Sequence, residues 1–171
     1  VLLPVSAALL CMLFSRIQKN LGSWIVIASI VGAFLSAVTS LQRVIADGGK
    51  ALHYWMGNWQ PPLGIEFVID PISGALAVLI TFISLLGAIY SLPFVKEEGW
   101  LHIGGYYTLY GLMTVGMCGM VITGDVFNLY VFLEVMSLSG YGLIAIGGKK
   151  SMLAAFRYLL IGTIGASLYL L

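Results

Sequence analysis

The sequence has very little charge. Of its 171 residues only 9% are charged, whereas 60% are hydrophobic, and the mean hydropathy is +1.03. Soluble domains typically contain about 25% charged and about 45–50% apolar residues. A chain so poor in charged residues cannot cover a surface exposed to water. The composition therefore excludes a soluble globular protein and predicts an integral protein of a lipid bilayer.

The sequence also has few cysteines and a small net charge. Cys11 and Cys118 lie in separate apolar stretches, without a CxxC motif and without clustered histidines. We therefore expect no metal site, no disulfide framework and no cofactor in this chain. The formal net charge of +1 offers no basic surface for nucleic acid. If the protein serves a redox reaction, that reaction is expected in a partner.

What the sequence contains instead is six long apolar blocks. A bilayer core about 30 Å thick requires roughly 20 apolar residues per helix. The blocks lie at about residues 1–17, 21–41, 71–92, 103–123, 126–146 and 152–171. We expect an all-α integral membrane fold of about six transmembrane helices in a single domain (1–171). The chain begins with Val1 and ends inside an apolar block, which suggests a fragment or a natural split subunit.

One connection is long enough to form a small structure outside the membrane. Residues 42–70 contain Pro61 and Pro62, which are typical of turns, followed by a strand-like alternation over 65–69. This pattern predicts an extramembrane hairpin or flap between the second and third helices. His53 lies in the same segment and is expected to be a loop residue.

The basic residues favour one side of the bilayer. If the first loop is cytoplasmic, that side carries Arg16, Lys19, Lys96, Lys149 and Lys150, and the other carries Arg43 and Lys50. The positive-inside rule then predicts an amino terminus outside the cell membrane. Lys149 and Lys150 are most simply topology signals. The alternative is that they line a water-filled proton access path.

A carboxyl group occupies the middle of the block at 126–146. Glu134 lies about eight residues, or about 12 Å of helix, from the nearer end of this block. A charge there costs about 2.5–3.5 kcal/mol and by default marks an ion or proton path. Tyr130, Ser137 and Tyr141 share its helix face. A carboxyl group among hydroxyls can accept and release protons; the alternative is a glutamate that only holds helices together.

Two further residues allow two interpretations each. Arg157 lies about five residues into the last block. It either extends to the membrane surface or provides a fixed positive charge that tunes a carboxylate. Asp125 directly precedes the block that contains Glu134. It either caps that helix or lies on a proton access path.

The stretch from Thr123 to Glu134 reads TGDVFNLYVFLE. This string resembles the fifth-helix signature of the antiporter-like, proton-conducting membrane subunits. That family includes the D subunit of Mrp-type sodium/proton antiporters, the antiporter-like subunits of respiratory complex I, and relatives in energy-converting membrane hydrogenases. Residues 59–70 and 154–162 are similar to further family segments. The resemblance covers most of the chain and concerns the N-terminal portion of the family.

The resemblance implies a longer fourteen-helix fold of which this chain is a part. Glu134 is similar to the family's fifth-helix glutamate, which lies on the proton-transfer axis and pairs with a lysine on the seventh helix. The implied partners are other membrane subunits and peripheral iron–sulfur or nickel–iron redox subunits. A non-conducting scaffold subunit and a stand-alone secondary transporter remain as alternatives. The sequence contains no nucleophile–base set that would predict an enzyme active site of its own.

Overall fold

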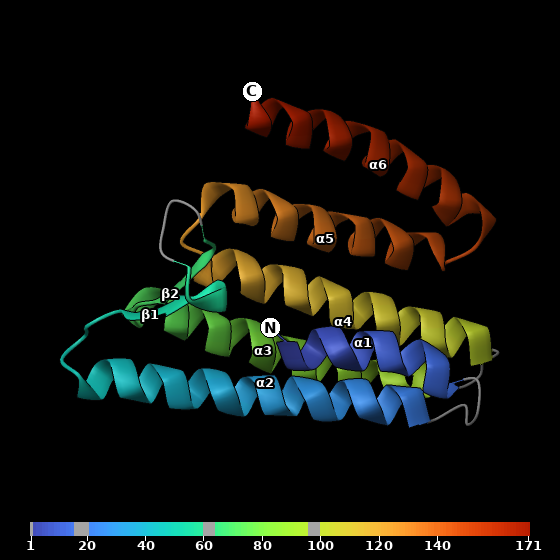
Figure 1. The fold of residues 1–171 in the computed structure, drawn as a ribbon. Coiled ribbons are helices and arrows are strands. Elements are labelled where there is room, and N and C mark those ends of the chain that lie inside the picture. Colours follow the sequence, from blue (N-terminus) through green and yellow to red (C-terminus); the bar gives the residue numbers. More distant parts are fainter. Residues whose placement is uncertain (1, 16–20, 60–63, 96–99) are drawn as a thin grey trace.

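Six α-helices and a two-stranded hairpin form the described chain (Figure 1). The computed structural model describes residues 2–15, 21–59, 64–95 and 100–171. The helices are α1 (Leu2–Ser15), α2 (Leu21–Ala46), α3 (Pro71–Val95), α4 (Trp100–Ile122), α5 (Val126–Ala145) and α6 (Lys149–Leu170). Helices α2 to α6 are long and apolar enough to cross a membrane, whereas α1 has 14 residues. The expectation of a helical, multi-pass membrane fold is confirmed.

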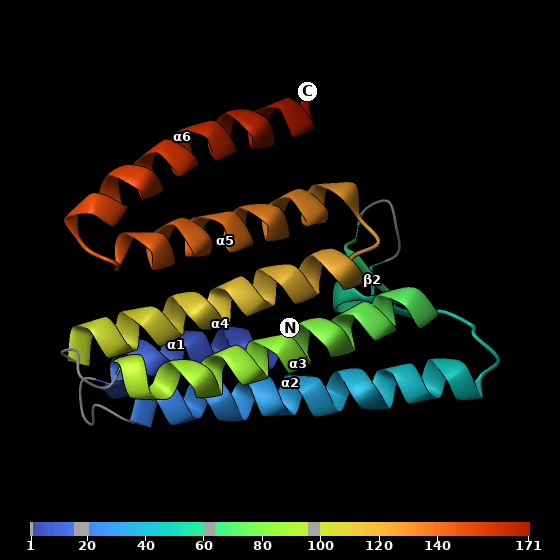
Figure 2. The same ribbon diagram turned by 180° about the vertical axis from the view of Figure 1, so that it is seen from behind.

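Helix α4 lies at the centre of the bundle, where it contacts α1, α2, α3 and α5. Helix α6 lies at the edge and packs mainly against α5, as both ribbon views show (Figures 1 and 2). The core forms where α1 to α4 meet. Its buried members are Cys11, Val26, Ile27, Ile30, Ala88, Ile103 and Tyr107. In contrast to this packed half of the bundle, α6 leaves most of its apolar side chains exposed.

The segment between α2 and α3 forms the predicted hairpin. Strands β1 (Leu52–Trp55) and β2 (Glu66–Ile69) pair antiparallel, with Trp55 opposite Glu66, and a short 3-10 turn, η1 (Met56–Asn58), follows β1. Pro61 and Pro62 lie outside the described residues. The N–H of Gly124 donates to the carbonyl of Glu66 at 2.9 Å. The hairpin is therefore attached to the turn that leads from α4 into α5.

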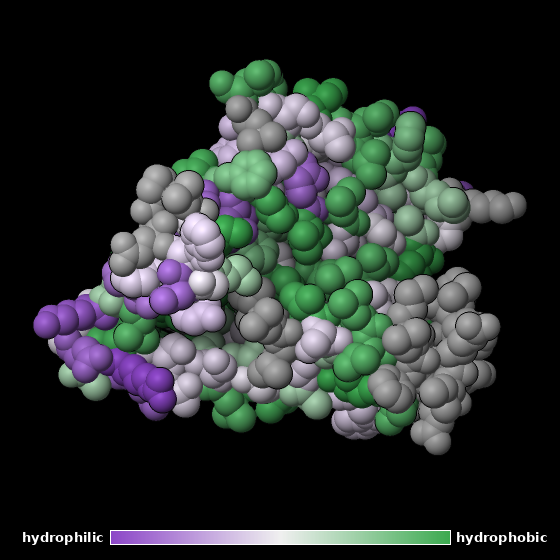
Figure 3. All heavy atoms as spheres, viewed as in Figure 1, coloured by the Kyte–Doolittle hydropathy of each residue, from purple (hydrophilic) through white to green (hydrophobic). Residues whose placement is uncertain are grey.

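Several helices extend beyond the apolar blocks. Helix α2 continues to Ala46 rather than ending near residue 41, and α6 begins at Lys149 rather than at 152. Apolar composition marks only the part of a helix that lies in hydrocarbon, whereas backbone hydrogen bonding continues past it. Polar residues gather at the end of the bundle beside the hairpin, and the visible side is largely apolar (Figure 3).

Candidate proton-transfer site

The start of α5 is fixed by Asp125. Its Oδ1 accepts hydrogen bonds from the N–H groups of Phe127 at 2.8 Å and Asn128 at 3.4 Å. These N–H groups have no partner inside the helix, so the carboxylate caps it. The buried Asn128 side chain in turn donates to Thr123 Oγ1 at 2.9 Å. Of the two interpretations of Asp125, capping is the one that has contacts in the structure.

One side of α5 packs closely against glycines of α4. A Cβ atom on Gly116 would lie 2.7 Å from the backbone nitrogen of Met136, and one on Gly119 would clash with the ring of Phe132. Residues two positions apart on a helix are about 200° apart around its axis. Glu134 lies between Phe132 and Met136 in sequence and therefore points away from α4.

The opposite side of α5 faces α6 through two pairs of tyrosines. The rings of Tyr130 and Tyr169 stack with centroids 6.3 Å apart and planes 8° apart. Those of Tyr141 and Tyr158 meet edge to face at 4.8 Å. Tyr130 and Tyr141 are two of the residues that the sequence places on the face of Glu134. Glu134 is therefore on the side of α5 that faces α6.

The described side chains that share the helix face of Glu134 carry hydroxyl groups. The Tyr130 side chain interacts electrostatically with the Glu134 carboxyl group, which is itself half-buried. Ser137 lies on the same face by its spacing in the helix and is also half-buried. The structure thus brings Tyr130, Glu134 and Tyr141 together along the boundary between α5 and α6. This set is the candidate proton-transfer site.

Arg157 and Lys150 form no ion pair with this carboxyl group among the described residues. Arg157 and Lys150 are exposed on α6, and Lys149 is the first residue of that helix. In the part of the chain that the structure describes, the ion pair is between His53 and Glu66, on the hairpin. A charge-tuning contact between Arg157 and Glu134 is therefore not present among the described residues.

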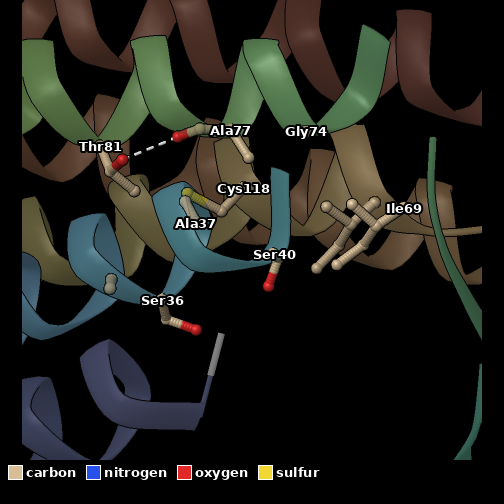
Figure 4. A pocket seen from close by; sticks show the side chains of 10 residues that line it. Ser36, Ala37, Ser40, Ile69, Gly74, Ala77, Thr81 and Cys118 are labelled. Carbon is tan, nitrogen blue, oxygen red and sulfur yellow. Dashed lines mark hydrogen bonds between the residues drawn. The ribbon is translucent and has the colours of Figure 1, made fainter. Parts of the chain in front are cut away.

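A cavity elsewhere in the bundle has no carboxyl, imidazole or amino side chain among its lining residues. It measures about 100 Å³ and lies among α2, α3, α4 and the end of β2 (Figure 4). Its lining consists of Ala33, Ser36, Ala37, Ser40, Ile69, Gly74, Ala77, Thr81, Cys118 and Ile122. The Thr81 hydroxyl donates back to the Ala77 carbonyl at 2.7 Å. Because neither α5 nor α6 contributes a residue, this cavity is separate from Glu134.

Sequence reasoning missed a polar cluster on the hairpin. Glu66 Oε1 lies 2.8 Å from His53 Nδ1 and accepts a hydrogen bond from Trp55 Nε1 at 3.0 Å. The bonds from His53 and then Trp55 hold the pKa of the Glu66 carboxyl below its ordinary value. The expectation that His53 is a loop residue is wrong, because it lies in strand β1 and pairs with Val68 of β2. Pairing the two short strands in sequence would have placed residues 53, 55 and 66 on one face.

Known membrane proteins match the chain along its whole length, although no family model matches it. NADH-quinone oxidoreductase subunit N from Desulforudis audaxviator is 40% identical over 171 residues, which are all of this chain and 34% of that protein. The D subunit of a probable K(+)/H(+) antiporter from Rhizobium meliloti is 30% identical over 178 residues, covering all of this chain and 32% of that protein.

A solved structure has the same helical arrangement. A chain of the membrane-bound sulfane sulfur reductase, an archaeal respiratory membrane complex, matches with a TM-score of 0.89 and 29% identity. The match covers 98% of this chain and 34% of that one. The present chain thus spans about a third of the length of the proteins it matches.

The fold and the site define a multi-pass membrane protein with a carboxyl group in the middle of a span. Within that class, the chain is similar along its whole length to part of the antiporter-like membrane subunits, and the family resemblance of the Thr123–Glu134 signature is confirmed.

Proposed function

We propose that this chain is the part of an antiporter-like subunit in which Glu134 takes up and releases protons that cross the membrane. The observation that carries the proposal is the position of Glu134. It lies near the middle of the 20-residue helix α5, half-buried, and faces α6 rather than the packed side against α4. Its side chain is too short to reach either membrane surface, so a role in transfer accounts for a group that is costly to place there.

The chemistry requires a charge whose distance from Glu134 changes. A positive charge within about 4–6 Å favours the ionised carboxylate, and withdrawal of that charge favours the protonated acid. The family resemblance implies that the counter-charge is a lysine on another helix. The absence of an ion pair at Glu134 among the described residues is compatible with a partner outside them. Approach and retreat of that lysine would release and reload the proton.

The proposal also covers the orientation of the subunit in the membrane and its partners. We place the chain in the cell membrane with its amino terminus and the hairpin outside, so that Lys149 and Lys150 are cytoplasmic. Its partners are the other membrane subunits of one complex. Peripheral iron–sulfur or nickel–iron subunits would couple transport to a redox reaction. Purification of the complex and identification of its chains test this, and subunits unrelated to ion translocation would contradict it.

The direct test is cation-driven or redox-driven proton transport in membrane vesicles that contain the assembled complex. Glu134→Gln is expected to reduce transport to the level of vesicles without the subunit, since an amide cannot exchange the proton. Glu134→Asp is expected to retain part of the rate because it keeps the acid but shortens its reach. Asp47→Asn is a matched control, because Asp47 is an exposed carboxylate just after α2. Full transport by Glu134→Gln would refute the proposal.

A further inference from the structure

Phe132 of α5 lies where the hairpin, α4 and α5 meet. Its ring covers Gly119 of α4 so closely that a Cβ atom added there would clash with it. The same ring contacts Phe67 of strand β2, with centroids 6.2 Å apart, and both side chains are half-buried. Phe132 is six residues, or about 9 Å of helix, beyond the first residue of α5. The hairpin therefore contacts α5 well past its start.

The hairpin also holds the residues that lead into α5 (Figures 1 and 2). The N–H of Gly124 donates to the carbonyl of Glu66 at 2.9 Å, and Thr123 pairs with Phe67 in an isolated antiparallel bridge. These backbone contacts fix the entry of α5, and the ring contact between Phe67 and Phe132 fixes the helix further along. A helix held at two levels resists rotation about its own axis.

Rotation of α5 would displace Glu134. Phe132 and Glu134 are two residues apart, so they project about 200° apart around the helix axis. Met136, one turn after Phe132, packs against Gly116 of α4 on the same side as Phe132. The end of a side chain lies about 5–6 Å from the helix axis, so a rotation of about 10° moves it by about 1 Å. The contacts on the Phe132 side therefore set the direction in which Glu134 points.

We propose that Phe67 is a positioning residue for Glu134. Through Phe132, it sets the rotation of α5 and thereby the position of the carboxyl group that exchanges protons. The inference rests on the proposed function, because it concerns the reacting geometry of Glu134. An element outside the membrane-spanning helices thus adjusts a group in the middle of a span.

The aromatic rings suit this role because they are rigid. A phenylalanine side chain has only two torsions, and its ring keeps its shape in every rotamer. The Phe132 ring cannot move toward α4, since it already touches the backbone position of Gly119. Phe67 blocks its movement toward the hairpin. Loss of the Phe67 ring would leave Phe132, and the turn of α5 that carries it, free to move in that direction.

The first test removes the ring from the hairpin. In the assembled complex, Phe67→Leu is expected to slow proton transport per complex by about 10–100-fold, because a displacement of about 1 Å at a reacting group has an effect of this size. The carbonyl stretching band of protonated Glu134, assigned by its loss in Glu134→Gln, should also change in frequency. If Phe67 only supported the fold, its replacement would lower the amount of assembled complex and leave that band in place.

Two controls accompany this variant. Phe82 of α3 forms a similar tilted pair with Phe34 of α2, with centroids 5.9 Å apart and planes inclined by 40°. Phe82→Leu removes a comparable ring contact between other helices, so transport per complex and the Glu134 band should not change. Phe67→Tyr keeps the ring and should retain both the transport rate and the band frequency.

A double-mutant cycle tests whether Phe67 acts through Phe132. Phe132→Leu alone is expected to slow transport and to shift the band by amounts similar to those of Phe67→Leu. The double variant should be no slower than Phe132→Leu alone, because the two rings form one contact. Independent, multiplying losses in the double variant would overturn the inference. So would a Phe67→Leu complex with the transport rate and band of the unchanged protein.

These results separate the two proposals. If Glu134→Gln abolishes transport while Phe67→Leu changes neither the rate nor the band, the positioning role is wrong and the role of Glu134 stands. If Glu134→Gln transports normally, the proposed function fails, and with it the role assigned to Phe67.

Discussion

Phe67 of strand β2 packs against Phe132 of helix α5, with ring centroids 6.2 Å apart and planes inclined by 47°. Phe132 precedes Glu134 by two residues and also fills the space over Gly119 of α4. Together with the hydrogen bond from Gly124 to Glu66, this contact ties the hairpin to the helix that carries the candidate site. The hairpin is therefore part of what holds α5 in place.

The fit between α4 and α5 predicts a large effect at Gly116. Gly116→Ala should lower the free energy of unfolding by about 1–3 kcal/mol, because the new methyl group meets the backbone of Met136, which cannot move aside. The measurement is unfolding in detergent micelles by a denaturing detergent. Gly105→Ala is the control on the same helix, since an added Cβ has nothing within 4 Å there. Equal stability of the two variants would contradict the packing described.

Variants of Asp125 can distinguish a helix-capping role of its carboxylate from a role in proton access. Asp125→Ala should destabilise α5 by about 0.5–2 kcal/mol through loss of its cap, whereas Asp125→Asn should retain most of the stability. Thermal unfolding of the purified complex measures both. Transport per assembled complex is expected to be unchanged in either variant. A well-folded Asp125→Asn complex that no longer transports protons would instead place this carboxylate on the access path.

The hairpin should loosen in acid. Hydrogen bonds from His53 and Trp55 lower the pKa of Glu66 in the folded state, so ionisation of Glu66 stabilises the hairpin. This stabilisation of the hairpin is present in full above 4.5, the ordinary pKa of a glutamate carboxyl group. It is lost as the pH falls from there through the lowered pKa that Glu66 has in the folded state. Hydrogen exchange of the hairpin amides, corrected for intrinsic rates, should show this loss of protection. Glu66→Gln should remove the pH dependence, and an unchanged profile in that variant would show that another group is responsible.

The sequence predicts where the helices lie better than it predicts which side of each helix packs against its neighbours. Apolar length alone locates the spans, and Asp125 is a recognisable helix cap. The partners of α5 could not be predicted in the same way, because its apolar residues surround the helix and no single stripe marks a packing side. The tyrosine contacts with α6 depend on a register between two helices that only the three-dimensional arrangement provides.

Infrared difference spectroscopy of the working complex tests the role of Glu134 most directly. If this carboxyl group carries protons, the band of a protonated carboxylic acid should appear and disappear as turnover starts and stops. The band should be missing from the Glu134→Gln complex and retained in Asp47→Asn. A Glu134 band that stays constant throughout turnover, in a complex that pumps protons, would contradict the account and leave Glu134 as a structural link between helices.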